Sequence, residues 1–162
     1  MKTNACRILD ALKISYTTRE YAVDPSDLSG QTVAKKIALP EEQVFMTLLC
    51  RVDTSGLVFA VLSVAQELDF KKLAAAAGGH KVKLASLSEV QPLTGYIRGG
   101  VTVFGSKKEY PAFVDASIER YDIISVSAGV RGLQILLAPA DYIRAANATV
   151  VPLTSKHSGD AV

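Results

Sequence analysis

Apolar residues recur at helical spacing in the first part of the chain and then alternate with polar residues. The recurring positions are Ala5, Ile8, Leu9 and Leu12. This spacing predicts a short amphipathic helix capped by Asn4. Residues 14–23, ISYTTREYAV, alternate in polarity and predict a strand. After a turn-forming segment, residues 31–39 are expected to form a helix that stops before Pro40, and residues 40–43 a further helical turn.

Two long apolar runs dominate the middle of the chain. VFMTLLCR (44–51) and LVFAVLS (57–63) are separated by the turn VDTSG. This arrangement predicts a β-hairpin at the centre of a sheet. Asp69 can cap a helix over residues 70–77, which the glycine pair at 78–79 would end.

The second half of the chain predicts shorter elements. Ser86 and Glu89 have the spacing of a capping box and predict a short helix before Pro92. Four short strands are expected, over residues 101–104, 112–115, 122–127 and 133–137. Pro139 suits the first position of a last helix, and residues 149–153 predict a final edge strand. The order of elements predicts one α/β domain with a mixed sheet and peripheral helices.

Composition narrows the class of protein. The 162 residues are 49% hydrophobic and 21% charged, as expected of one packed domain, with a frayed tail over residues 155–162. Residues 1–14 lack the pattern of a secretory signal or a membrane span, which predicts a cytoplasmic protein. Cys6 and Cys50 have no partner spacing for zinc or for a disulfide framework, and are expected to be buried thiols.

The net charge of +2 is far below the basic excess of a protein that grips a long nucleic acid, although a small footprint remains open. Paired lysines such as Lys71-Lys72 are expected to be solvated, unless folding brings several of them to one rim. Lys81 and Lys83 alternate beside His80, which is expected to be a solvated residue on a surface turn.

No nucleophile elbow, phosphate loop, dinucleotide fingerprint or zinc-binding helix motif is present. His80 and His157 are the two histidines, and neither suits a catalytic triad. What remains are two glycine-rich segments, RGG at 98–100 and SAGVRG at 127–132. They are either tight turns or loops whose amide N–H groups hold a carbonyl oxygen or an anion.

Three segments, in this order and spacing, carry a family resemblance: VFMTLLCR, TGYIRGGVTVFG and SVSAGVRGLQILLAP. They resemble the YbaK/ProX family of aminoacyl-tRNA deacylases. The resemblance implies a mixed, barrel-like sheet with flanking helices and an editing domain over residues 1–154. It also implies a trans-editing enzyme that cleaves the ester of a mischarged amino acid, cysteine or alanine, on tRNA(Pro). The implied partners are the acceptor end of aminoacyl-tRNA and a prolyl- or cysteinyl-tRNA synthetase, with no cofactor, metal or membrane.

The resemblance also implies which residues form the site. Backbone amides of Gly99, Gly100 and Val101 would face the aminoacyl-adenosine, where a side chain would block its approach. The implied pocket residues are Tyr21, Thr47, Ser127, Gly129 and Arg131.

The most diagnostic residue of the family is a lysine, and this chain has Met46 at that position. An uncharged thioether cannot act as a fixed charge or donor, and alternation along the strand places Met46 as an ordinary core methionine. Smaller departures are Thr102-Val103 in place of Ser-Pro, and Gln134 where a carboxylate is common. Three hypotheses remain: a deacylase that works through loop amides with water or the substrate's thiol, a catalytically impaired binding module, or, on composition, a metabolic α/β protein that binds a small ligand.

Overall fold

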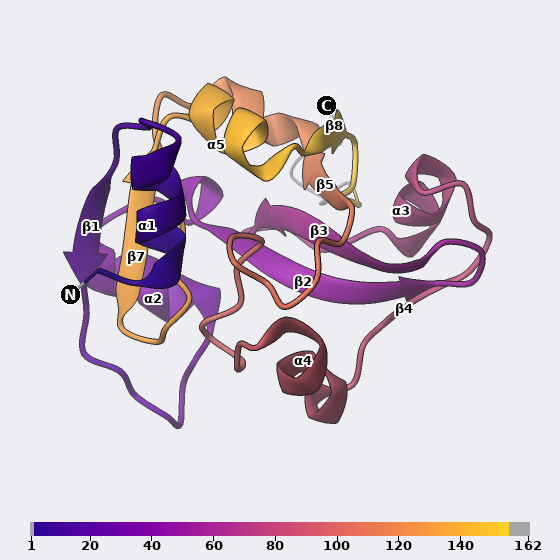
Figure 1. Ribbon diagram of the computed structural model, residues 1–162, viewed down its shortest axis with the longest axis horizontal. Coiled ribbons are helices and arrows are strands. Elements are labelled where there is room, and N and C mark those ends of the chain that lie inside the picture. Colours follow the sequence, from indigo (N-terminus) through magenta and orange to yellow (C-terminus); the bar gives the residue numbers. More distant parts are fainter. Residues whose placement is uncertain (1, 156–162) are drawn as a thin grey trace.

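The N-terminal part of the chain forms two helices and one strand. The computed structural model describes residues 2–155 (Figure 1). Its first elements are α1 (Asn4–Ala11), β1 (Thr17–Glu20), α2 (Gly30–Ile37) and the 3-10 turn η1 (Glu41–Gln43). The predicted cap of α1 was wrong by one residue: the Thr3 hydroxyl accepts from the amide of Cys6, and Asn4 already lies in the helix. Helix α2 stops before Pro40 as predicted, at a left-handed Ala38.

Strand β1 is shorter than the predicted 14–23. Its four residues are all exposed, and β7 is its one partner strand among the described residues. Alternation alone therefore overestimated a strand whose length is set by its pairing with β7.

The central hairpin is confirmed. Strands β2 (Phe45–Val52) and β3 (Gly56–Ser63) pair antiparallel and occupy the middle of a five-stranded mixed sheet of order β4-β2-β3-β5-β8. The other strands are β4 (Val82–Leu84), β5 (Ala112–Asp115) and β8 (Thr149–Val151). β8 is an edge strand, as predicted. His80 is exposed in a bend after α3, as predicted, and the residues that follow, Val82 to Leu84, add to the edge of β2 as β4, a strand that the sequence did not predict.

A second, three-stranded antiparallel sheet has the order β1-β7-β6. It contains β6 (Ile124–Ser127) and β7 (Leu133–Leu137). A parallel bridge between Val44 and Ser125 joins this sheet to the start of β2. The single α/β domain is thus confirmed, with its strands divided between two sheets that this bridge connects.

The remaining helices are α3 (Phe70–Ala76), α4 (Leu87–Thr94), the 3-10 turn η2 (Ala116–Arg120) and α5 (Pro139–Ala146). Asp69 caps α3, Ser86 and Glu89 form the predicted capping box of α4, and Pro139 begins α5. The end of α4 differs from the prediction, because the helix continues past Pro92 to Thr94. Pro92 has no N–H to donate to the carbonyl of Ser88. Ser88 is exposed, so this carbonyl can bond water instead.

The predicted strand over residues 101–104 was wrong. The segment is a loop without strand pairing, although Thr102 and Phe104 are buried. The Tyr96 hydroxyl donates to the Phe104 carbonyl, which satisfies one backbone group that a strand would have paired. Alternating burial here reflects a loop lying on the core.

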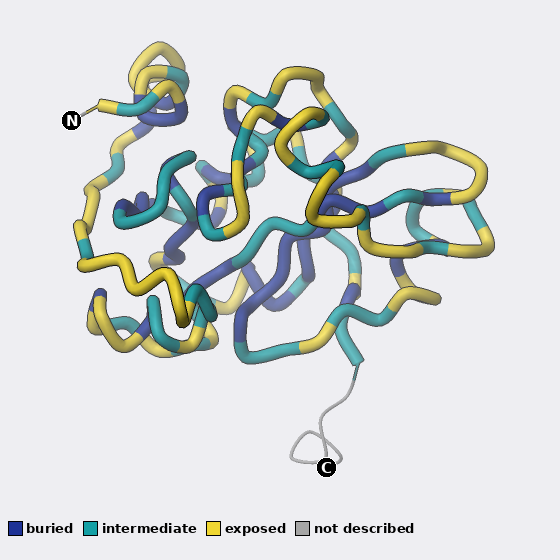
Figure 2. The backbone as a smooth tube through the Cα atoms, turned by 90° about the horizontal axis from the view of Figure 1, so that it is seen from below, coloured by how far each residue is buried: buried dark blue, intermediate teal, exposed yellow. Residues whose placement is uncertain are grey.

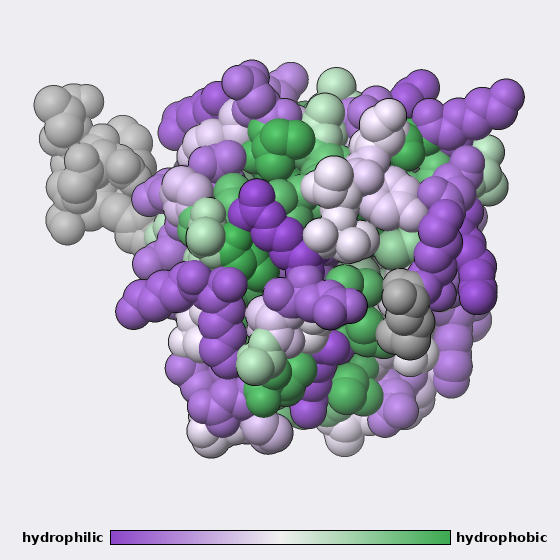
Figure 3. Space-filling view, turned by 90° about the vertical axis from the view of Figure 1, so that its left-hand side faces the viewer, coloured by the Kyte–Doolittle hydropathy of each residue, from purple (hydrophilic) through white to green (hydrophobic). Residues whose placement is uncertain are grey.

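The main core lies between α1, α5 and the facing parts of the two sheets. Its centre includes Leu9, Ile124, Ile135 and Tyr142, all fully buried. Separate clusters pack α3 and α2 against the five-stranded sheet, and Figure 2 shows buried backbone concentrated in the interior strands. The face beside α1 and β1 mixes hydrophilic and hydrophobic residues (Figure 3).

Both cysteines are buried free thiols, as predicted. Within the described chain, no helix is long and apolar enough to cross a membrane. Of the predicted tail, Ser155 donates its amide to the Glu67 carbonyl, and residues 156–162 lie outside the described residues.

Candidate active site

The two glycine-rich segments of the sequence lie against each other in the fold. The Nε of Arg131 donates to the carbonyl oxygen of Arg98 over 2.8 Å. A Cβ on Gly100 would lie 3.2 Å from the Cα and the carbonyl carbon of Val130. Loops 98–100 and 127–132 therefore form one surface, although about thirty residues separate them.

The adjacent glycines serve different purposes. Gly99 has φ +89°, a conformation that residues with a Cβ adopt at a cost of about 1–2 kcal/mol. Gly100 has an ordinary φ but is buried, and it allows the two backbones to approach closely. The pair thus shapes the loop for contact with its neighbour.

The amides of the loop differ in availability. The N–H of Gly100 donates to the Ile97 carbonyl over 2.9 Å and closes a tight turn. The N–H groups of Gly99 and Val101 donate to no protein acceptor in residues 2–155. Of the three predicted amides, two are thus left without a protein acceptor within the described residues, and the third stabilises the loop.

Tyr21 adjoins this surface. Its amide donates to the Gly132 carbonyl over 3.0 Å, directly after the end of β1. Tyr21 and Gly99 line a small pocket together with Asp27, Leu28 and Lys36. Its volume is about 10 Å³, room for roughly one water molecule. A larger ligand would require the segment around Leu28 to move.

Polar groups on one wall of this pocket are fixed by local hydrogen bonds. The Thr32 hydroxyl and the Ser29 amide donate to Asp27, and they lower the pKa of its carboxyl. The Nζ of Lys36 donates to the Ala22 carbonyl over 2.6 Å. The pocket therefore holds one cation near two exposed carboxylates, those of Asp24 and Asp27.

Met46 lies on β2 and packs half-buried against a cluster of apolar side chains. This cluster consists of Ala34, Ile37, Val44 and Val64. Tyr21 packs against the same cluster from the other sheet. The position of the family lysine is therefore an apolar contact between α2 and β2, on a cluster that Tyr21 also contacts.

Thr47 follows Met46 on the strand, so its side chain points to the opposite face of the sheet. There it adjoins the hydroxyl of Tyr142, whose pKa is raised by burial and lowered to a smaller extent by Thr47. The structure does not bring Thr47 and Met46 to one pocket wall.

Ser127 and Gly129 are held by the end of β6. The amide of Gly129 donates to the Ser127 hydroxyl over 3.2 Å, and Ser127 lies opposite Gln134 in the sheet. The Gln134 side chain is itself buried and accepts from the Ser125 hydroxyl over 2.6 Å. An uncharged polar pair thus occupies the place where the family often has a carboxylate.

Two further pocket residues, Leu28 and Lys36, did not emerge from the sequence. Leu28 lies in the turn-forming segment and Lys36 in the last turn of α2, and no local pattern distinguishes either from surface residues. Within the described residues, no three His, Cys, Asp or Glu side chains are grouped to hold a metal ion.

Comparison with known proteins defines the class. The pattern of the aminoacyl-tRNA editing domain matches residues 26–145. The chain belongs to this family, the YbaK/ProX aminoacyl-tRNA editing domain family, as its motifs predicted.

Individual relatives support this membership. The chain is 39% identical, over 96% of its length and 94% of the relative, to EbsC of Enterococcus faecalis, named as a proposed Cys-tRNA(Pro)/Cys-tRNA(Cys) deacylase. It is 34% identical over 64% of its length, and 65% of the relative, to the multifunctional Ser/Thr-tRNA deacylase ProXp-y of Escherichia coli. A crystal structure of a proposed trans-editing enzyme for prolyl-tRNA synthetase shares the fold. Its TM-score is 0.79 at 21% identity, covering 96% of this chain and 99% of the other.

Proposed function

We propose that this protein hydrolyses the ester bond of a mischarged aminoacyl-tRNA. The observation that carries the proposal is the pair of free amides at Gly99 and Val101, on a loop fixed by Arg131 and adjacent to Tyr21. Amides aimed at one point can bind the oxygen of an ester carbonyl and stabilise the negative charge that develops there during acyl transfer.

The reaction needs no protein nucleophile. Water adds to the carbonyl carbon, the bond to the ribose oxygen breaks, and this oxygen leaves with a proton as the hydroxyl of the terminal adenosine. The protein's thiols are poorly suited to attack, because Cys50 is fully buried and burial raises its pKa to about 12. The Ser127 hydroxyl accepts from the Gly129 amide and positions the loop.

Cysteine on tRNA(Pro) is the proposed substrate. Its thiol is the better nucleophile near neutral pH and can replace water: the sulfur bonds to the carbonyl carbon, the bond to the ribose oxygen breaks, and this oxygen takes the thiol proton. Cysteine leaves as a thiolactone that water then hydrolyses, which reduces what the protein must supply. The naming of EbsC supports this choice, and alanine is the second substrate to test. A prolyl- or cysteinyl-tRNA synthetase is the partner proposed to deliver the charged tRNA.

Met46 favours a second candidate function, a binding module that has lost turnover. The side chains that Met46 packs against are apolar, and two nearby cations are engaged by backbone carbonyls: Arg19 donates to that of Ile37, and Lys36 to that of Ala22. In this alternative the loop amides still bind the aminoacyl-adenosine, but the ester is not cleaved.

The two candidate functions are separated by measuring deacylation of cysteinyl- and alanyl-tRNA(Pro). Three proteins are compared: the natural chain, Met46→Lys and Met46→Leu. The proposed enzyme cleaves cysteinyl-tRNA with Met46 in place, and Met46→Leu retains that rate because the two side chains have similar volumes. Activity in Met46→Lys alone would establish the binding module. If all three proteins leave the esters intact and bind no tRNA, both functions fail. The lysine variant should also unfold more readily, by about 1–3 kcal/mol, because it places a charge in an apolar cluster.

A further inference from the structure

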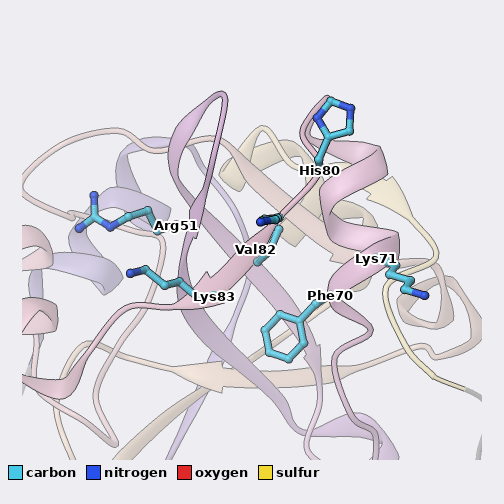
Figure 4. Close-up of a pocket in the computed structure, with 7 residues that line it drawn as sticks. Arg51, Phe70, Lys71, His80, Val82 and Lys83 are labelled. Carbon is cyan, nitrogen blue, oxygen red and sulfur yellow. The ribbon is translucent and has the colours of Figure 1, made fainter.

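A groove of about 520 Å³ opens beside strand β4 and the start of α3 (Figure 4). It shares no lining residue with the small pocket at Tyr21. Its walls come from three elements: Arg51 from β2, Phe70 and Lys71 from α3, and the segment 80–83 that leads into β4. This segment contributes His80, Lys81 and Lys83. Folding therefore brings lysines from separate parts of the sequence to one rim of the groove.

The lining of the groove carries positive charge and no carboxylate. The nearby acids are engaged: Glu89 pairs with Arg51, Asp53 accepts from the His80 amide, and Asp69 caps α3. By contrast, the three lysines of the lining have no carboxylate within ion-pair distance among the described residues. These are Lys71, Lys81 and Lys83. Their charge is therefore available to an external anion.

Phe70 adds an aromatic surface to this basic rim. It is the first residue of α3 and is 42% exposed, while Leu73 and Ala74 of the same helix are buried against the sheet. An exposed ring among cations is the combination that holds single-stranded nucleic acid, since bases stack on aromatic faces while lysines contact phosphates. Core packing gives no reason for a phenylalanine here.

We propose that this groove binds the phosphate backbone of the tRNA acceptor arm, next to its 3′ end, with Phe70 contacting a base or ribose. The inference rests on the proposed function, because it assumes that the terminal adenosine lies in the pocket by Tyr21. It adds a second contact that anchors the RNA at a distance from the reacting ester.

Strand β2 connects the two regions. Met46 and Tyr21 both pack against the cluster of α2, and Cys50 on the same face of β2 as Met46 packs into the cluster of α3. The four residue steps from Met46 to Cys50, on one face of β2, span about 14 Å, which corresponds to about four stacked nucleotides of one strand. An RNA strand that ends in the pocket therefore reaches the groove within a few nucleotides.

A simpler role for Lys81 and Lys83 is to keep the exposed edge strand β4 from pairing with another chain. That role requires neither Phe70 nor Lys71, which lie on α3 rather than on the edge. Binding of uncharged tRNA distinguishes the two roles without any need for catalysis.

The test compares the natural protein with the double variant Lys81→Glu/Lys83→Glu over a series of salt concentrations. Arg120→Glu/Arg144→Glu is the matched control, with the same change of net charge on exposed arginines of η2 and α5. The groove variant should bind tRNA at least about tenfold more weakly, and its salt slope should fall by about 1.4–1.8. The control should bind within about twofold of the natural protein.

Phe70→Ala supplies a second readout, since it should weaken binding without altering the salt slope. Equal losses in the groove variant and the control, or no loss in the groove variant, would overturn the proposal. The proposal would also fail if the groove variant lost binding to anionic lipid vesicles but kept its binding to tRNA. Melting temperatures establish that each variant is folded, and the neutral pair Lys81→Gln/Lys83→Gln replaces the charge reversal if it does not fold.

Cysteine esterified to adenosine alone serves to separate this inference from the proposed function. The groove variant should hydrolyse it at the natural rate, because the ester is too short to reach the groove. If the natural protein leaves that ester and charged tRNA intact, the proposed function fails, while the tRNA-binding comparison still decides whether the groove binds RNA.

Discussion

Arg131 holds the carbonyl oxygen of Arg98 by a 2.8 Å hydrogen bond from its Nε, and this bond links the two loops that form the candidate active site. The loops come from distant parts of the chain: one follows α4, and the other connects β6 to β7. The free amides of Gly99 and Val101 therefore owe their position to a side chain from the other loop.

Replacement of Arg131 by alanine should lower deacylation more than stability. A partly exposed hydrogen bond of this kind contributes about 0.5–1.5 kcal/mol, so kcat/KM should fall about threefold to tenfold while the fold is retained. Arg98→Ala is the control, because the acceptor is the backbone carbonyl and survives this change. Equal losses in both variants would show that charge, rather than the link between the loops, supports the activity.

The conformation of Gly99 leads to a second prediction. Gly99→Ala and Gly56→Ala both place a Cβ at positive φ, +89° and +79°, so each should lower the free energy of unfolding by about 1–2 kcal/mol. A Cβ at Gly99 would also lie 3.3 Å from the Arg131 side chain. Among the described residues, a Cβ at Gly56 would have no heavy atom within 4 Å apart from those of its two chain neighbours. We expect denaturant unfolding to report similar losses, with deacylation reduced in Gly99→Ala alone. Comparable activity of the two variants would contradict a role for this loop in catalysis.

Much of the fold could be predicted from local pattern. The hairpin of β2 and β3, the Asp69 cap and the capping box of α4 depend on residues close in the chain, and all are confirmed. Local pattern was wrong where distant partners decide the structure. β4 forms because β2 offers an edge, and residues 101–104 are buried without pairing.

The site shows the same division. Sequence could indicate that the segments around Gly100 and Arg131 expose backbone, but their mutual contact depends on tertiary packing. Alternation correctly placed Met46 among apolar residues. Leu28 and Lys36 escaped detection because each becomes a pocket residue only when α2 and its preceding turn fold against Tyr21.

The Asp27 carboxylate predicts a pH dependence of stability. Its hydrogen bonds with Thr32 and Ser29 lower its pKa below the ordinary value of 3.8 in the folded protein. A lowered folded pKa stabilises the protein above the unfolded value, and this contribution is lost as pH falls through the folded pKa. The melting temperatures of the natural protein and Asp27→Asn should therefore differ above pH 3.8, and this difference should disappear in acid. Thr32→Val should reduce the same divergence, whereas parallel curves at every pH would refute the assignment.

Leu28 should set the size of the amino acid that the pocket accepts. Its Cδ2 lies 3.7 Å from the position of a Cβ on Gly99, and it lines a pocket of only about 10 Å³. Leu28→Ala removes that cover, so kcat/KM should rise for esters of larger amino acids relative to alanine, by about threefold to tenfold. Leu12→Ala, at a 49% exposed residue just after α1, is the control and should leave this ratio unchanged. An unchanged ratio in Leu28→Ala would mean that the aminoacyl group is not bound under the segment around Leu28.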